Sequence, residues 1–245
     1  MLRSFLLSVV LLAACDASDR TPAAQSASTT ESCLCFAGIG SSEGDVPVLE
    51  LNAEGEVRLI VCGTAETAVE RGKVTMSEFD VFACDSGASV IRYGAADIAE
   101  VALEGSDLHI TRLGRLPSGK NWQWQQVPLF RQTVSAAGLS PQVTAPESVF
   151  KAPVLDQASF EAFDSELAMM KASKATAIDD WENFFGKLLV CAQAGHRSCI
   201  AALKNPAGVL GIDLDGAAAE SHREAVALFS AIGGKLDNDI EAHSR

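Results

Sequence analysis

Hydrophobic and polar residues alternate through the first half of the chain, in a pattern typical of β-strands that bury one face. The segment 78–84 shows this most clearly, because the alternation places Phe79, Val81 and Ala83 together. Further runs lie at 48–51, 57–61, 89–93, 108–113, 122–125 and 127–134. Roughly seven or eight short strands, with turns every ~8–12 residues, are typical of a sandwich or a small barrel.

Turn and loop residues refine this prediction. The runs 48–51 and 57–61 flank a loop that contains Gly55, which is a hairpin signal. Residues 116–120 predict a loop, and Pro128 predicts a sheet edge or a kink.

The hydrophobic period changes after a proline-containing segment, 139–153, which we interpret as the joint between two parts. Asp156 is a fair N-cap for a helix that carries Phe160, Phe163, Leu167 and Met170. A second helix is expected from a capping box at Asp179–Glu182 and should end at Gly195.

Two further helices are predicted near the C-terminus. Ser198 is the expected cap of a short helix that stops at Asn205-Pro206. A capping box at Ser221–Glu224 predicts the start of a last helix, which continues to Ile240 with a kink at Gly233-Gly234.

The predicted fold class is therefore α+β, with an N-terminal antiparallel β-sandwich or small barrel followed by a C-terminal α-helical bundle. The expected segments are a signal peptide (1–14), a lipidated cysteine and flexible tether (15–32), a β domain (33–138), a linker (139–153) and an α-helical domain (154–245).

The N-terminus has the features of a secretory signal. Arg3 supplies a positive charge, and the apolar run 5–12 is far shorter than the ~20 residues that span a bilayer. A positive start, a short apolar run and small residues before a cleavage site are typical of an exported protein.

The small residues end at a cysteine, and Leu12-Ala13-Ala14-Cys15 resembles the lipobox of bacterial lipoproteins. The resemblance implies cleavage before Cys15, a diacylglyceryl group on its sulfur and an acyl chain such as palmitate on its amine. Several acyl chains anchor a protein stably, at ~0.8 kcal/mol per buried CH₂. We therefore expect a periplasm-facing lipoprotein of the cell envelope, attached to the lipid bilayer through acylated Cys15.

Two features follow the anchor. Asp16 resembles the inner-membrane retention signal of enteric lipoproteins, but that rule does not extend to all Gram-negative bacteria, so the choice between inner and outer membrane stays open. Residues 16–32 contain no aromatic or large aliphatic side chain, which predicts a flexible tether with a reach of roughly 25 Å.

The remaining cysteines suggest disulfides, because their number is even and the chain is exported. They are Cys33, Cys35, Cys62, Cys84, Cys191 and Cys199. Cys33 and Cys35 share a strand face and should reach different partners among Cys62 and Cys84. Zinc is the competing interpretation, but the Cys-x-Cys spacing is shorter than usual.

Cys191 and Cys199 constrain the local fold. On one straight helix their Cα atoms would lie ~12 Å apart, whereas a disulfide needs them within ~7 Å. A bridge therefore requires the chain to reverse between them, at the corner of a helical hairpin.

The net charge of −13 disfavours binding to nucleic acid and favours solubility, with a basic partner as the alternative. No motif of a serine hydrolase, zinc peptidase or nucleotide-binding loop is complete. We therefore predict no catalytic residue, metal site or cofactor, and a non-enzymatic protein rather than an enzyme.

Trp122, Trp124 and Lys120 are the candidate binding residues. The two indole rings share one strand face beside a loop and could stack on a sugar ring or a partner loop. The alternative is that both rings belong to the core.

The segment from Cys84-Asp-Ser-Gly87 through Glu104-Gly105 is similar to the small β-barrel lysozyme inhibitors of the bacterial envelope. For such an inhibitor, a protruding loop such as 116–121 would matter, although here Ser118-Gly119 continues into Lys-Asn-Trp, which departs from that family's pattern. The remainder of the chain resembles uncharacterised envelope lipoproteins.

Three functions are compatible with these features. The first is a non-enzymatic module that binds an envelope protein partner. The second is an inhibitor or immunity protein against a lysozyme-like or toxin enzyme. The third is an envelope hydrolase whose site has no recognisable motif.

Overall fold

The computed structural model describes residues 33–52, 58–118, 122–138, 140–152, 155–173, 180–211 and 213–236, which all belong to one compact unit. The predicted signal peptide, Cys15 and the tether 16–32 lie outside the described residues, as does Lys120.

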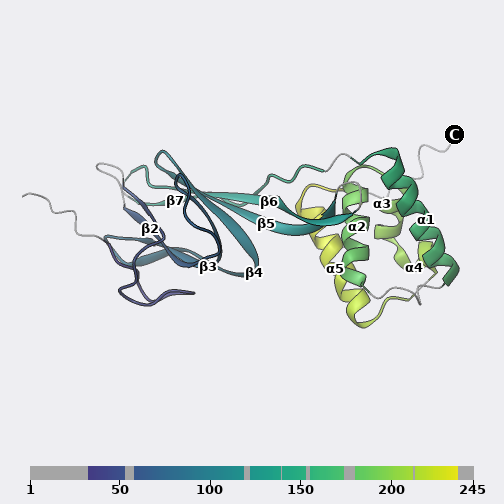
Figure 1. Cartoon of the computed structure of the whole chain (residues 1–245), viewed down its shortest axis with the longest axis horizontal. Helices are drawn as coiled ribbons and strands as arrows, with labels where there is room; N and C mark the ends of the chain where they lie inside the picture. Colours follow the sequence, from purple (N-terminus) through teal and green to yellow (C-terminus); the bar gives the residue numbers. More distant parts are fainter. Residues whose placement is uncertain are drawn as a thin grey trace, which may run out of the picture. The chain divides into compact units, whose positions relative to one another are not determined.

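The first part of the described chain forms an eight-stranded antiparallel sheet (Figure 1). Its strands are β1 (Leu49–Leu51), β2 (Leu59–Ala65), β3 (Lys73–Ala83), β4 (Ala88–Glu104), β5 (Asp107–Ser118), β6 (Gln123–Ser135), β7 (Gln142–Val143) and β8 (Glu147–Ser148). From β1 to β7 each strand pairs with its neighbour in sequence, and β8 pairs with β6. An α+β chain with an antiparallel sheet before its helices is therefore confirmed.

Three of the strands are much longer than predicted, since β4, β5 and β6 contain 17, 12 and 13 residues. The predicted runs 122–125 and 127–134 merge into the single strand β6, which begins at Gln123 and leaves Trp122 in the preceding turn. β5 continues into the predicted loop at 116–120. The expected irregularity at Pro128 is present as a register shift, because Arg112 pairs with Phe130 and the next residue pairs with Pro128.

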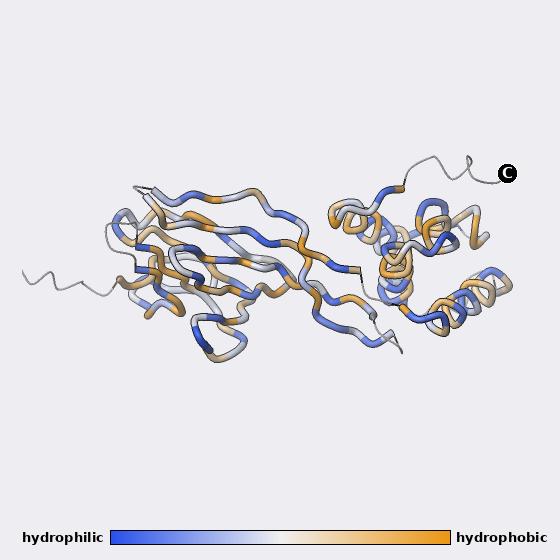
Figure 2. The backbone as a smooth tube through the Cα atoms, turned by 90° about the horizontal axis from the view of Figure 1, so that it is seen from above, coloured by the Kyte–Doolittle hydropathy of each residue, from blue (hydrophilic) through white to orange (hydrophobic). Residues whose placement is uncertain are grey.

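The inner face of the sheet carries one apolar core. Phe79, Val81 and Ala83 of β3 point into it, as their alternation predicted. Val74 and Met76 of the same strand also join this core, although they have the opposite parity. Both sets share a face because the β3–β4 ladder is irregular after Met76. Figure 2 shows the resulting mixture of hydrophobic and hydrophilic residues along the strands.

The N-terminal segment covers the outer face of β2 and β3 and is held there by two disulfides. Cys33 pairs with Cys84, and Cys35 pairs with Cys62. Beneath them the side chains of Ile60 and Phe82 are buried in a small second cluster. The expectation that Cys33 and Cys35 reach different partners is confirmed, and the structure decides the pairing.

The β5–β6 hairpin contributes to two cores. Leu108 and Val134, at one end, belong to the core of the sheet. Leu116 and Leu129, nearer the turn, belong to the core of the helices. The predicted linker also contacts the sheet, because its described part contains β7 and β8, which both pair with β6.

Five helices follow: α1 (Gln157–Ser173), α2 (Trp181–Gln193), α3 (Arg197–Lys204), α4 (Pro206–Leu210) and α5 (Gly216–Ala231). They surround a core that is rich in phenylalanine and leucine. None of the helices within the described ranges is both long and apolar enough to cross a membrane.

Several helix boundaries agree with the sequence. The Asp156 carboxylate accepts a hydrogen bond from the Ser159 N–H at 2.8 Å, which confirms it as a cap. Gly195 follows Ala194, the C-cap of α2, and has a φ of +85°, as expected of the residue that stops this helix.

Other boundaries differ. The cap of α2 is Asp180 rather than Asp179, which lies outside the described residues. Ser198 lies inside the first turn of α3, whose N-cap is His196. Ser221 lies inside α5, which begins at Gly216. The predicted kink is the end of the helix, because Gly233 adopts a φ of +89°.

Candidate functional site

The sheet forks between β4 and β5. β4 pairs with β3 over Ala88–Ala102 but with β5 only over Ala99–Glu104. Beyond Arg112, β5 pairs only with β6. Within the described ranges no strand therefore pairs with the second edge of β4 from residue 88 to 98. An edge of this kind presents backbone N–H and C=O groups to an incoming strand.

A pocket of about 200 Å³ lies at this fork. Its walls come from four places in the chain: Tyr93 of β4, Ile110 and Arg112 of β5, Phe130, Arg131 and Gln132 of β6, and Pro146. Cross-strand pairing places Ile110 beside Gln132 and Arg112 beside Phe130 on one face. The ring of Tyr93 stacks on the buried ring of Phe79 at 4.9 Å, so the pocket adjoins the core of the sheet.

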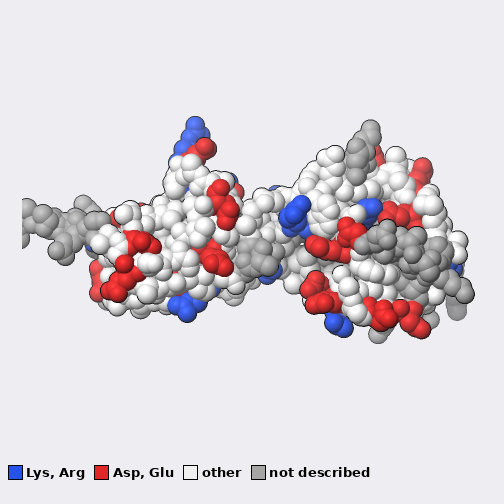
Figure 3. All heavy atoms as spheres, turned by 60° about the horizontal axis from the view of Figure 1, so that its bottom comes forward, with Lys and Arg blue, Asp and Glu red and all other residues white. Residues whose placement is uncertain are grey.

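The chemistry of this pocket is that of an apolar cavity with a cationic rim. Arg112 and Arg131 are both exposed, and a guanidinium group matches a carboxylate in shape and charge. Acidic side chains form several groups on the face shown in Figure 3, whereas basic ones are scattered. Against a net charge of −13, the two arginines provide local attraction for an acidic group next to an apolar one.

A second cleft, of about 190 Å³, lies between the β5–β6 hairpin and the start of α2. Arg115, Trp124, Asp180 and Glu182 line it, and the Arg115 guanidinium lies 5.7 Å from the centre of the Trp124 ring. Asp180 already accepts the capping hydrogen bond of α2, so one of its two carboxylate oxygens is occupied. The cleft thus contains charges of both signs.

The structure separates the two predicted binding tryptophans. Trp122 is half-buried, contacts the helical core and lies 5.4 Å from the ring of Phe163 in α1. Trp124 is also half-buried, and its ring edge lies 3.7 Å from the position that a Cβ on Gly186 would take. Both rings pack the hairpin against the helices, and Trp124 also lines the cleft beside Arg115.

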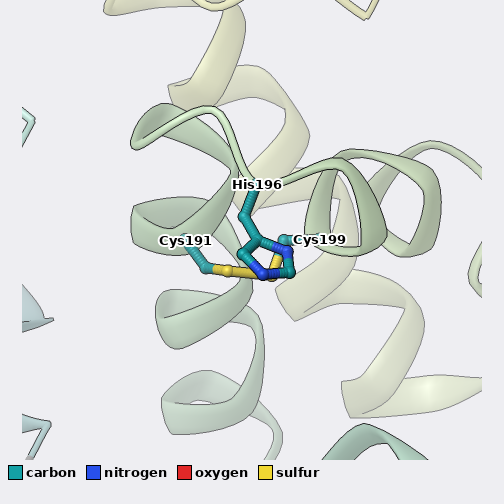
Figure 4. Close-up of side chains that lie close together, drawn as sticks. All are labelled: Cys191, His196 and Cys199. Atoms are coloured by element: carbon teal, nitrogen blue, oxygen red, sulfur yellow. A yellow bond between two sulfur atoms is a disulfide. The ribbon is translucent and has the colours of Figure 1, made fainter. Parts of the chain in front are cut away.

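The corner between α2 and α3 contains a disulfide and a histidine side chain next to it. Cys191 and Cys199 form the predicted disulfide, with a Cα–Cα distance of 5.8 Å, and the chain reverses between them. The His196 ring lies beside the two sulfur atoms (Figure 4). Sequence reasoning identified the cysteines but missed this histidine.

Ser198, His196 and Asp164 form a hydrogen-bonded group at the same corner. The Ser198 hydroxyl lies 2.8 Å from Nδ1 of His196 and donates to Asp164 Oδ1 at 2.7 Å. Because its proton points to the carboxylate, His196 must be the donor in the other contact and is not placed to deprotonate Ser198. The group therefore lacks the geometry of a nucleophile and its base.

Two further residues were not identified from the sequence. Arg112 follows Leu108 and Ile110 on the inner face of β5, and a charge on an apolar strand face was the signal that could have found it.

Asp80 is completely buried and accepts hydrogen bonds from the Ile39 N–H, Ser89 Oγ and Arg92 Nε at 2.6, 3.2 and 3.0 Å. It joins the N-terminal segment to β3 and β4.

No protein-family model matches the chain, and neither a curated protein nor a solved structure shows significant similarity to it.

Proposed function

We propose that the chain is a lipid-anchored, non-enzymatic binding module of the bacterial cell envelope that holds an extended segment of a protein partner at the fork between β4 and β5. The observation that carries this proposal is the apolar pocket with its two arginines beside an unpaired strand edge.

Two features support the envelope as its location. The resemblance of Leu12–Cys15 to a lipobox favours export and lipidation at Cys15. The disulfides Cys33–Cys84, Cys35–Cys62 and Cys191–Cys199 favour an oxidising compartment such as the periplasm.

The fork supports recognition by strand addition. A partner segment that pairs with β4 would gain backbone hydrogen bonds, which supply affinity without demanding a particular sequence. The pocket at the end of this edge would then select a residue with an apolar side chain that lies next to an acidic group. Arg112 would receive that acidic group in a charge-assisted hydrogen bond.

We also propose roles for the sheet and the helices in this binding. The bent sheet would act as a half-closed sandwich or barrel whose open side receives the partner. The helices would act as a bundle that supports the far end of the β5–β6 hairpin through Leu116 and Leu129.

An inhibitor or immunity protein is one form that this binding function could take, with a lysozyme-like or toxin enzyme as partner. The loop 116–121 is the less favoured contact for such a partner, because Leu116 and Pro117 are buried. The third alternative, an envelope hydrolase, is disfavoured at the corner of α2 and α3 by the direction of the Ser198 hydrogen bond.

The anchor predicts a first result. Replacing Cys15 with alanine should abolish incorporation of a clickable palmitate analogue, because the thiol is the acceptor of the lipid, and should release the protein from membranes. Cell fractionation and in-gel fluorescence measure both effects. Cys33→Ala is the control and should keep its label. Continued labelling of the Cys15→Ala protein would refute the anchor.

The fork predicts a second result. Residues 33–245 of the natural sequence, immobilised as a bait, should capture the partner from envelope extracts. The Arg112→Glu bait should lose this partner, because charge reversal repels the acidic group. At least a tenfold loss of recovery is expected, which corresponds to about 1.4 kcal/mol. Quantitative mass spectrometry of the eluates measures it.

Arg115→Glu is the matched control, since Arg115 lies on the same strand but lines the other cleft. Full recovery on this variant is expected. Loss on Arg115→Glu with recovery on Arg112→Glu would move the binding site to the Trp124 cleft, and equal recovery on both variants would contradict the proposal.

A further inference from the structure

The corner between α2 and α3 holds three metal-ligating side chains. Cys191 lies near the end of α2, His196 is the N-cap of α3, and Cys199 lies at the third position of α3. One ligand atom from each residue lies within 4.8 Å of the other two (Figure 4). Sulfur and imidazole nitrogen are the ligands that zinc prefers in proteins.

We propose that this corner is a redox-controlled zinc site, which holds a disulfide in its oxidised state and binds Zn²⁺ through Cys191, Cys199 and His196 once it is reduced. The proposal is independent of the binding function at the fork.

The spacing of the residues suits the metal. The pattern Cys-x₄-His-x₂-Cys places all three ligands in one short turn, and Gly195 supplies the reversal with its φ of +85°. A tetrahedral site with Zn–S bonds of ~2.3 Å needs the sulfur atoms ~3.8 Å apart. The Cα–Cα distance of 5.8 Å allows such a separation by side-chain rotation alone.

The surroundings of His196 orient its ring for this role. Nδ1 lies 2.8 Å from Ser198 Oγ, whose proton is directed to Asp164, so Nε2 is the nitrogen left for the ion. Phe160 stacks on the ring at 4.6 Å and limits its rotation. A metal-binding histidine is commonly fixed in this way through its other nitrogen.

Charge and burial also suit the ion. Both sulfur atoms belong to residues with no exposed surface, where an unbalanced charge is costly. Two thiolates, a neutral imidazole and Zn²⁺ have no net charge together. Asp164 Oδ2 lies 3.5 Å from His196 Nε2, so this carboxylate is close enough to act as the fourth ligand, with water as the alternative.

Electrons and protons are conserved when the metal replaces the disulfide. A dithiol reductant transfers two electrons and two protons to the Cys191–Cys199 bond, which breaks to give two thiols while the reductant becomes a disulfide. Zn²⁺ then displaces the two thiol protons, which leave to solvent, and binds both thiolates.

Cobalt(II) is the probe that tests the proposal, because thiolate-to-cobalt absorption reports directly on sulfur ligands. The full chain, reduced with a phosphine that does not bind the ion, should bind Co²⁺ with thiolate absorption, and Zn²⁺ should displace it. The oxidised protein should show none. His196→Gln should weaken Co²⁺ binding at least tenfold, whereas His222→Gln should leave it unchanged.

The other five cysteines of the full chain, Cys15 included, require a second measurement. Zn²⁺ should protect Cys191 and Cys199 of the reduced chain from alkylation, as mapped by mass spectrometry, and should not protect them in the His196→Gln variant. Far-UV circular dichroism of each reduced sample establishes that the helices persist. The proposal is overturned if the reduced chain shows no thiolate absorption, or if His196→Gln binds and protects as the natural sequence does.

Discussion

Replacement of Phe163 with alanine is expected to lower the free energy of unfolding by about 3–5 kcal/mol, the usual cost of a large aromatic deletion in a core. Phe163 has no exposed surface. Its ring lies 5.4 Å from that of Trp122 and 6.1 Å from that of Phe184, so it joins α1 to the hairpin and to α2. The cavity would therefore weaken three elements at once.

Urea unfolding followed by tryptophan fluorescence measures this loss. Trp122 and Trp181 pack against the helical core and report on it directly. Met169→Ala is the control on the same helix, because this side chain is 67% exposed and should cost less than about 0.5 kcal/mol. Equal unfolding midpoints for the Phe163→Ala and Met169→Ala variants would show that Phe163 does not hold these elements together.

Replacement of Asp80 with alanine is expected to cost about 2–4 kcal/mol, because hydrogen bonds to a buried charged group contribute about 1.5–3 kcal/mol each. The loss leaves the Ile39 N–H without its acceptor at 2.6 Å. The Arg92 ion pair adds little, since the Arg92 side chain is 57% exposed. The N-terminal segment should then loosen from the sheet, although its two disulfides still hold it.

Hydrogen exchange of the Ile39 amide is the direct measurement, and it should accelerate strongly in the Asp80→Ala variant. Asp80→Asn keeps the shape and one acceptor oxygen, so its loss of stability should be smaller. Asp85→Ala, at an exposed residue after β3, should be neutral. Unchanged exchange at Ile39 in the Asp80→Ala variant would contradict the role of Asp80.

The α5 helix shows why local signals misplaced some elements. The capping box at Ser221 is worth about 1 kcal/mol. Ala218 precedes that box and is buried, so burial of this residue favours a helix that starts earlier. Asp215, at the actual N-cap, makes no side-chain capping hydrogen bond. Packing against the core therefore outweighed capping in setting the start of this helix.

The fork between β4 and β5 could not be predicted from the sequence, for a different reason. Its pocket joins Tyr93, Arg112 and Phe130, which belong to different strands and meet only through the register of β4, β5 and β6. Alternation predicts which face of a strand is apolar, but it does not predict where two neighbouring strands cease to pair. A single charge among apolar residues was the only local sign of the site.

The amino-acid sequence by itself determined that strands precede helices and that Phe79, Val81 and Ala83 of β3 face inward, because hydrophobic periodicity is a local property. It also determined that Cys191 and Cys199 need a chain reversal, since the reach of a disulfide is short. Only the tertiary structure decided that Cys33 bonds to Cys84, that Asp80 is buried and that His196 faces the sulfur atoms. These contacts depend on how segments far apart in the chain pack together, and local sequence patterns do not predict that packing.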